Sequence, residues 1–268
     1  MPTIDANGIS IHYEVFAPDS GDAPPLLFFN GSFSTLATSR PLVQVFGSRL
    51  HTVAHDQRGL GETSIPPGPY TMADYAADGL ALIDALGWET CRVVGISFGG
   101  MVAQEFAVTN PERVERLALL CTSPGGEGGS SYPMHELRAL PIEERARVSI
   151  SIMDTRFSEE WFAEHPSDLA LVTAMGDRPS PAEGTEAARG EIEQANARRH
   201  HDVWDRLPAI SCPTLVAAGR YDGIAALSNS EAIVSKVPDA QLRVYEGGHA
   251  FFAQDPRAFG EILDFLAE

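Results

Sequence analysis

A serine lies at the centre of the motif Gly95-Ile96-Ser97-Phe98-Gly99, between an apolar run and an amphipathic stretch. The run from Arg92 to Gly95 predicts a strand, and the residues from Phe98 to Thr109 predict a helix that ends at Asn110-Pro111. Glycines on both sides of a serine permit a tight turn that presents its hydroxyl. The free N–H groups of the following helix face the same point. Ser97 is therefore the candidate nucleophile, and the turn that carries it is a predicted nucleophile elbow.

A serine hydroxyl is a weak nucleophile at neutral pH, so it needs a base that a third group orients. Asp222 lies just after the strand pattern Leu215 to Ala218, and His249 follows the pattern Leu242 to Tyr245 across two glycines. An Asp-Gly pair is by itself more often a turn, and a lone histidine is more often structural. Their positions after predicted strands favour Asp222 as the acid and His249 as the base.

Acyl chemistry at a serine also needs two backbone N–H groups that bind the negative oxygen of the intermediate. One is expected from Phe98, directly after the nucleophile. The second is expected from the loop Asn30-Gly31-Ser32-Phe33, which follows the apolar run Leu26 to Phe29. Ser32 is the predicted donor and Phe33 the alternative, although a Gly-Ser loop can also be an inert turn.

The elements that must position these groups alternate along the chain. Strand patterns at Ile9–Phe16, Leu26–Phe29, His51–Ala54 and Leu117–Cys121 join those already named. Helical spacing covers residues 71 to 86, with Thr71 as the expected N-cap, and a last helix lies near 256 to 267. This alternation predicts an α/β fold in which a mainly parallel sheet is flanked by helices.

The pattern breaks at Ser123-Pro124-Gly125-Gly126, and strand signals stay absent to about Leu207. Residues 1–123 and 209–268 are therefore predicted to form the core, and residues 124–208 an inserted helical cap. Cap aromatics such as Trp161 and Trp204 are candidate substrate contacts, together with Phe33 from the core, although packing explains the cap residues equally well. Further cap residues could line a pocket or bind a substrate carboxylate: Met134, Phe162, Arg138, Arg145, Arg147, Arg198 and Arg199.

Composition narrows the class of protein. The chain has 268 residues with 37 acidic and 19 basic side chains, and its net charge of −18 disfavours a nucleic-acid partner. No apolar run is long enough for a membrane span, and the N-terminus lacks a signal-peptide pattern, so a cytoplasmic location is expected. Three cysteines in apolar runs indicate buried free thiols, and no histidine stands near them at metal-ligand spacing. We expect no metal, no cofactor, and a monomer or homodimer.

Together these motifs resemble the α/β-hydrolase superfamily over nearly the whole chain. Asp56-Gln57-Arg58-Gly59-Leu60-Gly61 is similar to its structural D-x-R-G-x-G loop, and the order Ser97, Asp222, His249 matches its triad. The proline-rich run from Pro66, the elbow and the Gly-Gly-His ending resemble the branch of 3-oxoadipate enol-lactonases and cofactor-free haloperoxidase-like esterases. Two features depart from that pattern: Asn30 stands where many members have His, and Phe98 is expected to narrow the pocket.

The resemblance implies a serine hydrolase that cleaves a small carboxylic ester or lactone through an acyl-enzyme. Ser97 in the elbow argues against epoxide hydrolases and haloalkane dehalogenases, which use a carboxylate nucleophile on this fold. Two alternatives stay open: hydrolysis of a carbon–carbon bond in a diketone-like substrate, and a ligand receptor without catalysis on the same fold.

Overall fold

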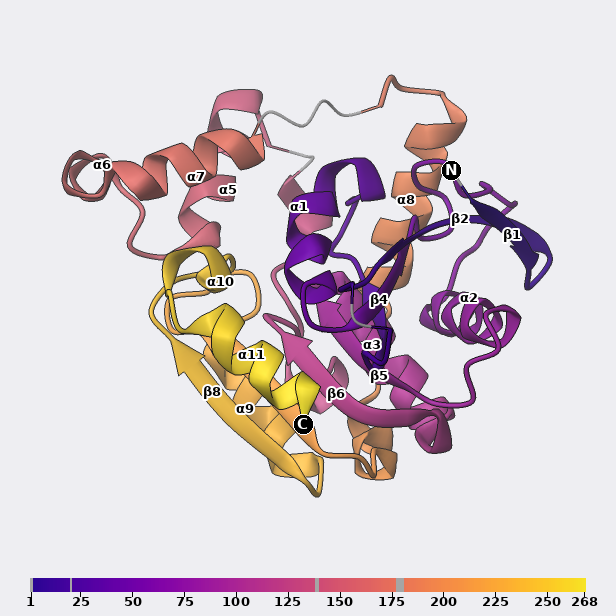
Figure 1. Cartoon of the computed structure of the whole chain (residues 1–268). Helices are drawn as coiled ribbons and strands as arrows, with labels where there is room; N and C mark the ends of the chain where they lie inside the picture. The colour runs from indigo at the N-terminus through magenta and orange to yellow at the C-terminus, as the bar shows by residue number, and fades with distance from the viewer. Residues whose placement is uncertain (1, 20, 138–139, 177–180) are drawn as a thin grey trace.

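Eight strands form one sheet among the residues that the computed structural model describes, which are 2–19, 21–137, 140–176 and 181–268 (Figure 1). Their order in the sheet is β1-β2-β4-β3-β5-β6-β7-β8. β1 pairs antiparallel with β2, β2 pairs antiparallel with β4, and all other neighbours pair parallel. The strands are β1 (Thr3–Ala6), β2 (Ile9–Phe16), β3 (Pro25–Phe29), β4 (His51–His55), β5 (Cys91–Ile96), β6 (Val114–Leu120), β7 (Thr214–Gly219) and β8 (Ala240–Tyr245). The carboxyl ends of the parallel strands therefore lie along one edge, where the following loops can meet.

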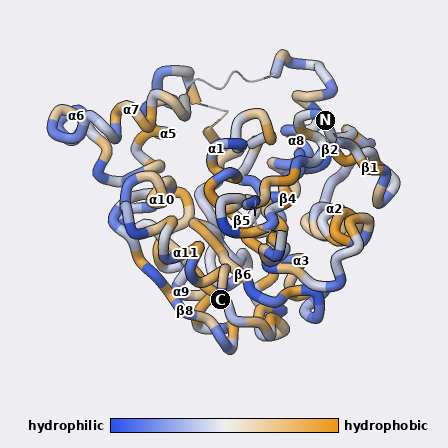
Figure 2. The backbone as a smooth tube through the Cα atoms, in the orientation of Figure 1, coloured by the Kyte–Doolittle hydropathy of each residue, from blue (hydrophilic) through white to orange (hydrophobic). Residues whose placement is uncertain are grey.

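Helices cover both faces of this sheet. On one face α1 (Leu36–Gly47) and α11 (Ala258–Ala267) bury an apolar layer. On the other face α2 (Met72–Ala85), α3 (Phe98–Thr109) and α9 (Leu227–Lys236) bury a second layer. The parallel strands are apolar on both sides because both faces are covered. Figure 2 shows this pattern, with hydrophobic residues along β6 and α11 and hydrophilic residues at the outer turns.

The predicted α/β sheet is confirmed, and most of its elements form where the sequence places them. β2 spans Ile9–Phe16 and α3 spans Phe98–Thr109. Thr71 caps α2: its hydroxyl accepts the Asp74 N–H at 3.2 Å, and the Asp74 carboxylate accepts the Thr71 N–H at 2.8 Å. The elements β1, α1 and α9 were not predicted from the sequence. β1 has only four residues, and Pro41 lies inside α1 and interrupts its helical pattern.

The segment 124–208 is helical in its described part, as predicted. It contains α4 (Met134–Leu137), α5 (Ile142–Met153), α6 (Glu159–Glu164), α7 (Pro166–Gly176) and α8 (Glu186–Arg199), followed by a 3-10 helix at Trp204–Ala209. An isolated bridge between Gly125 and Asp202 joins its two ends. α6 and α7 project from the sheet, whereas α8 lies against the core (Figure 1). The division into core and cap stays a prediction that this helical content supports.

α8 reaches the core through backbone contact. A Cβ atom on Gly190 would lie 1.9 Å from the carbonyl oxygen of Gly59, so the backbone of α8 contacts the backbone of this loop directly. Arg189 also donates to the carbonyl oxygens of Ile65 and Pro66 at 2.6 and 2.7 Å. These contacts fix α8 over the loop that follows β4, and they place its last turns above the carboxyl edge of the sheet.

The Asp56–Gly61 loop holds several elements together. The buried Asp56 carboxylate accepts the N–H groups of Leu36 and Glu62 at 2.7 and 2.9 Å. Arg58 donates twice to Asp78 of α2, at 2.6 and 2.7 Å. The loop thus ties β4 to the start of α1 and to α2. These contacts give it a structural role, which the resemblance implies.

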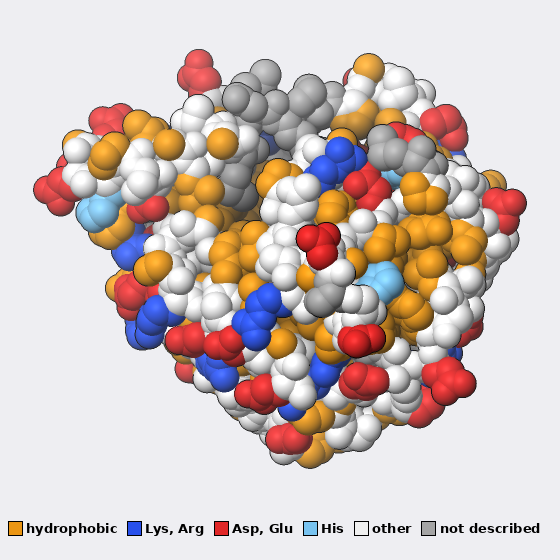
Figure 3. Space-filling model, viewed as in Figure 1, with side chains coloured by type: hydrophobic (Ala, Val, Ile, Leu, Met, Phe, Trp, Pro, Cys, Tyr) orange, Lys and Arg blue, Asp and Glu red, His pale blue; other side chains and the backbone are white. Residues whose placement is uncertain are grey.

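The surface charges and the cysteines are arranged as the composition leads one to expect. Acidic side chains are spread over the face seen in Figure 3, with basic groups between them. The three cysteines, Cys91, Cys121 and Cys212, are buried and free. Among the described residues, no helix combines the length and the apolar character that a membrane span requires.

Candidate active site

Ser97 lies at a strained turn between β5 and α3. Its backbone has φ 55° and ψ −115°, a conformation that few non-glycine residues adopt. A Cβ on Gly95 would lie 2.2 Å from the Gly99 oxygen, and one on Gly99 would lie 2.1 Å from the Phe29 oxygen. Both glycines are therefore needed because backbone approaches backbone there. The turn places the Ser97 hydroxyl at the carboxyl edge of the sheet.

His249 connects Ser97 to Asp222. Its Nε2 lies 2.9 Å from Ser97 Oγ, and its Nδ1 lies 2.8 Å from Asp222 Oδ2. The second Asp222 oxygen accepts the N–H groups of Ile224 and Ala225 at 2.8 and 2.9 Å, which orients the buried carboxylate. A carboxylate beside Nδ1 requires the proton on that nitrogen, so the Nε2 lone pair is left to accept the Ser97 proton. The structure thus brings the three predicted residues together in the order that proton transfer needs.

The predicted oxyanion donors also lie near the nucleophile. Phe98 opens α3, so its N–H has no acceptor within the helix. Ser32 lines the same cavity as Ser97, and a Cβ on the preceding Gly31 would lie 3.9 Å from Ser97 Cβ. The Phe33 N–H, in contrast, donates to Gln194 Oε1 at 2.6 Å. A side chain therefore already occupies the N–H of the alternative donor, and Ser32 stays the predicted one.

Gln194 is a residue that sequence analysis missed. It is buried on α8, and its bond holds Phe33 at φ 59° in the loop after β3. No local pattern marks Gln194, because the loop it contacts is 161 positions away along the chain. Asn30, which stands where the superfamily often has His, is buried and accepts a 2.9 Å bond from Gln57 at its carbonyl oxygen. Both contacts stabilise the loop that carries Ser32.

Ser97 and His249 open into a cavity of about 720 Å³. Its walls are largely apolar, with Leu42, Ile96, Met134, Leu171, Ile224 and Phe252 among them. Two of the candidate substrate contacts, Phe33 and Met134, are among its lining residues. A volume in this range fits a small organic molecule.

Two expectations about aromatic residues at this cavity need correction. Trp161 is not among the residues that line it, because the indole stacks on His165 at 3.8 Å and donates to Asp168 at 2.8 Å. Trp204 packs instead against Lys236 and the core. Phe98 does not narrow the cavity, because its ring is fully buried against Tyr75, with 5.1 Å between the ring centroids.

The arginines of the predicted cap differ in which cavity they line. Arg198 lines the cavity that holds Ser97 and also a neighbouring cavity of about 800 Å³. Arg145 and Arg199 line only the neighbouring one, and Arg147 lines neither of the two. Arg138 lies outside the described residues.

The end of α5 lies between the two loops that carry Asp222 and His249. The carbonyl oxygens of Ile152 and Met153 accept the N–H groups of Gly223 and His249, at 3.0 and 2.6 Å. The carbonyl oxygen of Tyr221 accepts the Thr155 N–H at 2.9 Å. This stretch of the predicted cap therefore bridges the loops that carry Asp222 and His249. The bridge is made by backbone hydrogen bonds, which residue types do not predict.

Asp154 anchors that bridge. Its fully buried carboxylate accepts two bonds from the Arg156 guanidinium, at 2.9 and 2.6 Å, and one from Gln254 at 3.1 Å. Gln254 in turn accepts the N–H of Gly248, the residue before His249, at 2.9 Å. A chain of hydrogen bonds thus runs from the end of α5 to the loop that carries the imidazole.

Comparisons with known proteins identify the family of the fold. A family model described as the alpha/beta hydrolase fold matches residues 24–256. The chain is 25% identical over 263 residues to 3-oxoadipate enol-lactonase 2 of Acinetobacter baylyi, covering 98% of this chain and 94% of the relative. It is 30% identical over 264 residues to a protein named as the carbamate hydrolase RutD of Variovorax paradoxus, covering 96% of each.

A solved structure supports the same fold. The enol-lactonase of Burkholderia xenovorans LB400 superposes with a TM-score of 0.79 at 22% identity, over the whole of both chains. The named relatives are hydrolases, and the family model spans most of the sequence. The chain therefore belongs to the α/β hydrolase family.

Proposed function

We propose that this hydrolase cleaves a small carboxylic ester or lactone through an acyl-enzyme on Ser97. The observation that carries the proposal is the bonded series Asp222–His249–Ser97, which opens into a largely apolar cavity. The 25% identity to an enol-lactonase over 98% of the chain favours a lactone as the first substrate to test. Residues 124–208 serve as the cap that closes this cavity.

In the proposed reaction Ser97 Oγ attacks the carbonyl carbon while His249 Nε2 takes the hydroxyl proton. Asp222 holds the imidazole in its tautomer and stabilises the imidazolium that forms. The N–H groups of Phe98 and Ser32 bind the oxygen that becomes negative; loss of one such donor typically costs about 2.7–4 kcal/mol of transition-state stabilisation.

The tetrahedral intermediate then collapses. The carbon–oxygen bond to the alcohol breaks, and the imidazolium of His249 gives its proton to that oxygen. In a lactone the new hydroxyl stays attached to the acyl chain. A water molecule, deprotonated by His249, attacks the acyl-enzyme; the carboxylic acid leaves, and Ser97 recovers its proton.

A fluorophosphonate probe tests the nucleophile. Labelling of the pure protein, with mass spectrometry to locate the adduct and Ser97→Ala as the control, is expected to place the adduct on Ser97. The Ser97→Ala variant should remain folded and lose both labelling and turnover. An adduct elsewhere, or full activity in a pure Ser97→Ala sample, would overturn the proposal.

A substrate panel separates the competing functions. Lactones, small esters and carbamates are to be compared with diketone-like substrates at equal concentration. Faster turnover of the lactones and esters supports the proposal. Faster carbon–carbon cleavage, or ligand binding without turnover and without labelling, contradicts it and favours one of the two alternatives.

A further inference from the structure

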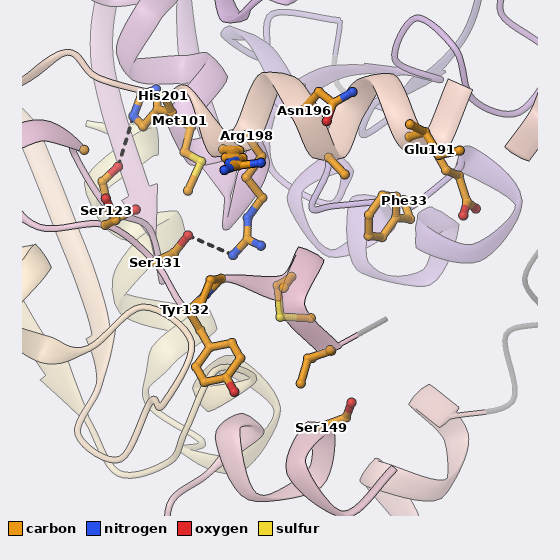
Figure 4. A pocket seen from close by; sticks show the side chains of 18 of the residues that line it. Phe33, Met101, Ser123, Ser131, Tyr132, Ser149, Glu191, Asn196, Arg198 and His201 are labelled. Atoms are coloured by element: carbon orange, nitrogen blue, oxygen red, sulfur yellow. Dashed lines mark hydrogen bonds between the residues drawn. The ribbon is translucent and has the colours of Figure 1, made fainter. Parts of the chain in front are cut away.

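Two cavities meet beside the nucleophile. The cavity of about 720 Å³ that holds Ser97 shares Phe33, Met134 and Arg198 with the second cavity of about 800 Å³. In Figure 4, Arg198 extends from α8 into the second cavity toward Ser131 and Tyr132, while Phe33 lies on the opposite side. Arg198 thus stands where the two spaces join.

The Arg198 guanidinium lacks a negative partner among the described residues. Its Nη2 donates to the neutral Ser131 hydroxyl at 2.8 Å, and its buried Nε has no hydrogen-bond partner. Burial lowers the pKa of Arg198 to about 10, which reflects lost hydration that no nearby carboxylate offsets. Burying a charge without such compensation costs stability, and a bound anion would supply the missing partner.

Three other partly buried arginines of this chain are paired with carboxylates. Arg58 donates twice to Asp78, and Arg206 donates to both oxygens of Glu105 at 2.7 and 2.6 Å. Arg156 is held by the Asp154 carboxylate in the same way. The fold therefore supplies a carboxylate for these three guanidinium groups. Among the described residues the buried Arg92 of β5 also has guanidinium nitrogens without a hydrogen-bond partner, but it lines neither cavity. Arg198 differs from all of these arginines because it combines the missing carboxylate with a position that borders the nucleophile.

The charges around Arg198 favour an anion. Among the described residues that line the Ser97 cavity, Arg198 is the one Lys, Arg, Asp or Glu side chain. The second cavity adds Arg145 and Arg199 against a single carboxylate, Glu191. Its hydroxyl and amide groups come from Ser123, Ser130, Ser131, Tyr132, Ser149 and Asn196. In a chain of net charge −18 this is a local excess of positive charge that an anionic ligand can neutralise.

We propose that Arg198 binds a carboxylate carried by the substrate itself, while the ester or lactone carbonyl lies at Ser97. The proposal rests on the proposed function and narrows its substrate class to anionic esters and lactones. The planar guanidinium matches a carboxylate geometrically, and the bond becomes charge-assisted in a site with little water. The apolar walls then hold the carbon chain between the two polar ends.

Matched ester pairs test this assignment. Monomethyl succinate, glutarate and adipate are to be compared by pH-stat with the neutral methyl butanoate, pentanoate and hexanoate. Arg198→Met keeps the length of the side chain and removes its charge. We expect this variant to lose about 10- to 150-fold in kcat/KM for the anionic esters, the range for a hydrogen bond to a charged group, and less than about threefold for the neutral esters.

Controls separate the charge from the fold. Arg147→Met removes an exposed arginine of α5 that lines neither cavity, and it should leave both ester series unchanged. Arg198→Met should unfold at a temperature no lower than the parent, because it removes an uncompensated charge. Equal losses on anionic and neutral esters, or no preference of the parent for anionic esters, would overturn the proposal.

Two readouts distinguish this proposal from the function on which it rests. Fluorophosphonate labelling of Ser97 should proceed equally in the parent and in Arg198→Met. Calorimetric titration with glutarate needs no turnover, and it should show binding to the parent that Arg198→Met loses. Labelling without glutarate binding overturns the role of Arg198 alone. Glutarate binding without labelling supports Arg198 and contradicts the serine mechanism, and preferential binding of inorganic phosphate overturns the choice of a carboxylate.

Discussion

Asp154→Ala tests whether the end of α5 positions the imidazole of His249. The variant removes a fully buried carboxylate, two charge-assisted bonds from Arg156 and the bond from Gln254. The backbone bridge at Met153 then loses the side-chain contacts that fix it. Both stability and the position of the histidine loop should respond, because one cluster supports both.

The magnitude follows from the burial of the pair. Breaking a buried ion pair by removing one partner costs about 3–5 kcal/mol. The Arg156 side chain is 20% exposed, so it can regain some hydration, and the expected loss is about 3 kcal/mol. For a domain near this size that corresponds to a fall in Tm of roughly 6–12 °C. Displacement of His249 by a fraction of an ångström to 1 Å should lower kcat about 10- to 100-fold, with KM changed less than about threefold.

The assay combines urea denaturation with steady-state kinetics on an ester that the parent cleaves. Glu105→Ala is the matched control, because Glu105 is also buried, is also held by an arginine through two bonds, and also joins the core to segment 124–208. It should lose comparable stability and keep its kcat. Asp154→Asn should restore part of the kcat. If Asp154→Ala loses stability while kcat stays at the parent value, the cluster supports only the fold and the reasoning is wrong.

Three further outcomes are expected. Asp222→Asn should lower kcat on the order of 10⁴-fold with little change in stability, since the amide favours the wrong imidazole tautomer. A fall of less than tenfold in the acylation rate, measured by burst kinetics, would contradict the role of Asp222. Burial lowers the pKa of His201 to about 4, so the unfolded chain binds a proton between pH 6.5 and 4 that the folded chain does not. Stability should therefore fall by about 3 kcal/mol as the pH drops through that window, and urea titrations of His201→Gln should show a shallower dependence. Gly99→Ala should lower the free energy of unfolding by more than about 3 kcal/mol, because the new Cβ meets the backbone of β3. Gly260→Ala, in open space on α11, should leave the free energy of unfolding unchanged or raise it by up to about 1 kcal/mol. Equal denaturation midpoints for the two variants would disprove the steric argument.

Local signals were enough to single out the three residues that the structure brings together at the cavity. Ser97 could be placed because a strand, two glycines and a helix all lie within a short stretch, and each is readable on its own. Asp222 and His249 follow strands of a parallel sheet, and the ends of such strands share one edge. The sheet, with α2 and α3, was predictable for the same reason, since hydrophobic periodicity reports directly which faces are buried.

Contacts between distant segments were not readable in this way. The contacts of Gln194 and Asp154, and the lack of a carboxylate beside Arg198, depend on how α5 and α8 pack over the core. No residue pattern predicts that packing. Phe98 illustrates the same limit at one residue. Its N–H position follows from the helix start, but the direction of its ring was decided by space beside Tyr75.

The sequence by itself determined the kind of chemistry, because a nucleophile, a base and an acid are properties of residue type and of their positions at strand ends. Tertiary structure alone decided that Gln194 accepts the Phe33 N–H, which side chains line the cavity, and that Arg198 borders it without a carboxylate partner among the described residues. The physical reason is that hydrogen-bond satisfaction and desolvation depend on every neighbour of a group in space. Most of those neighbours lie far from it along the chain.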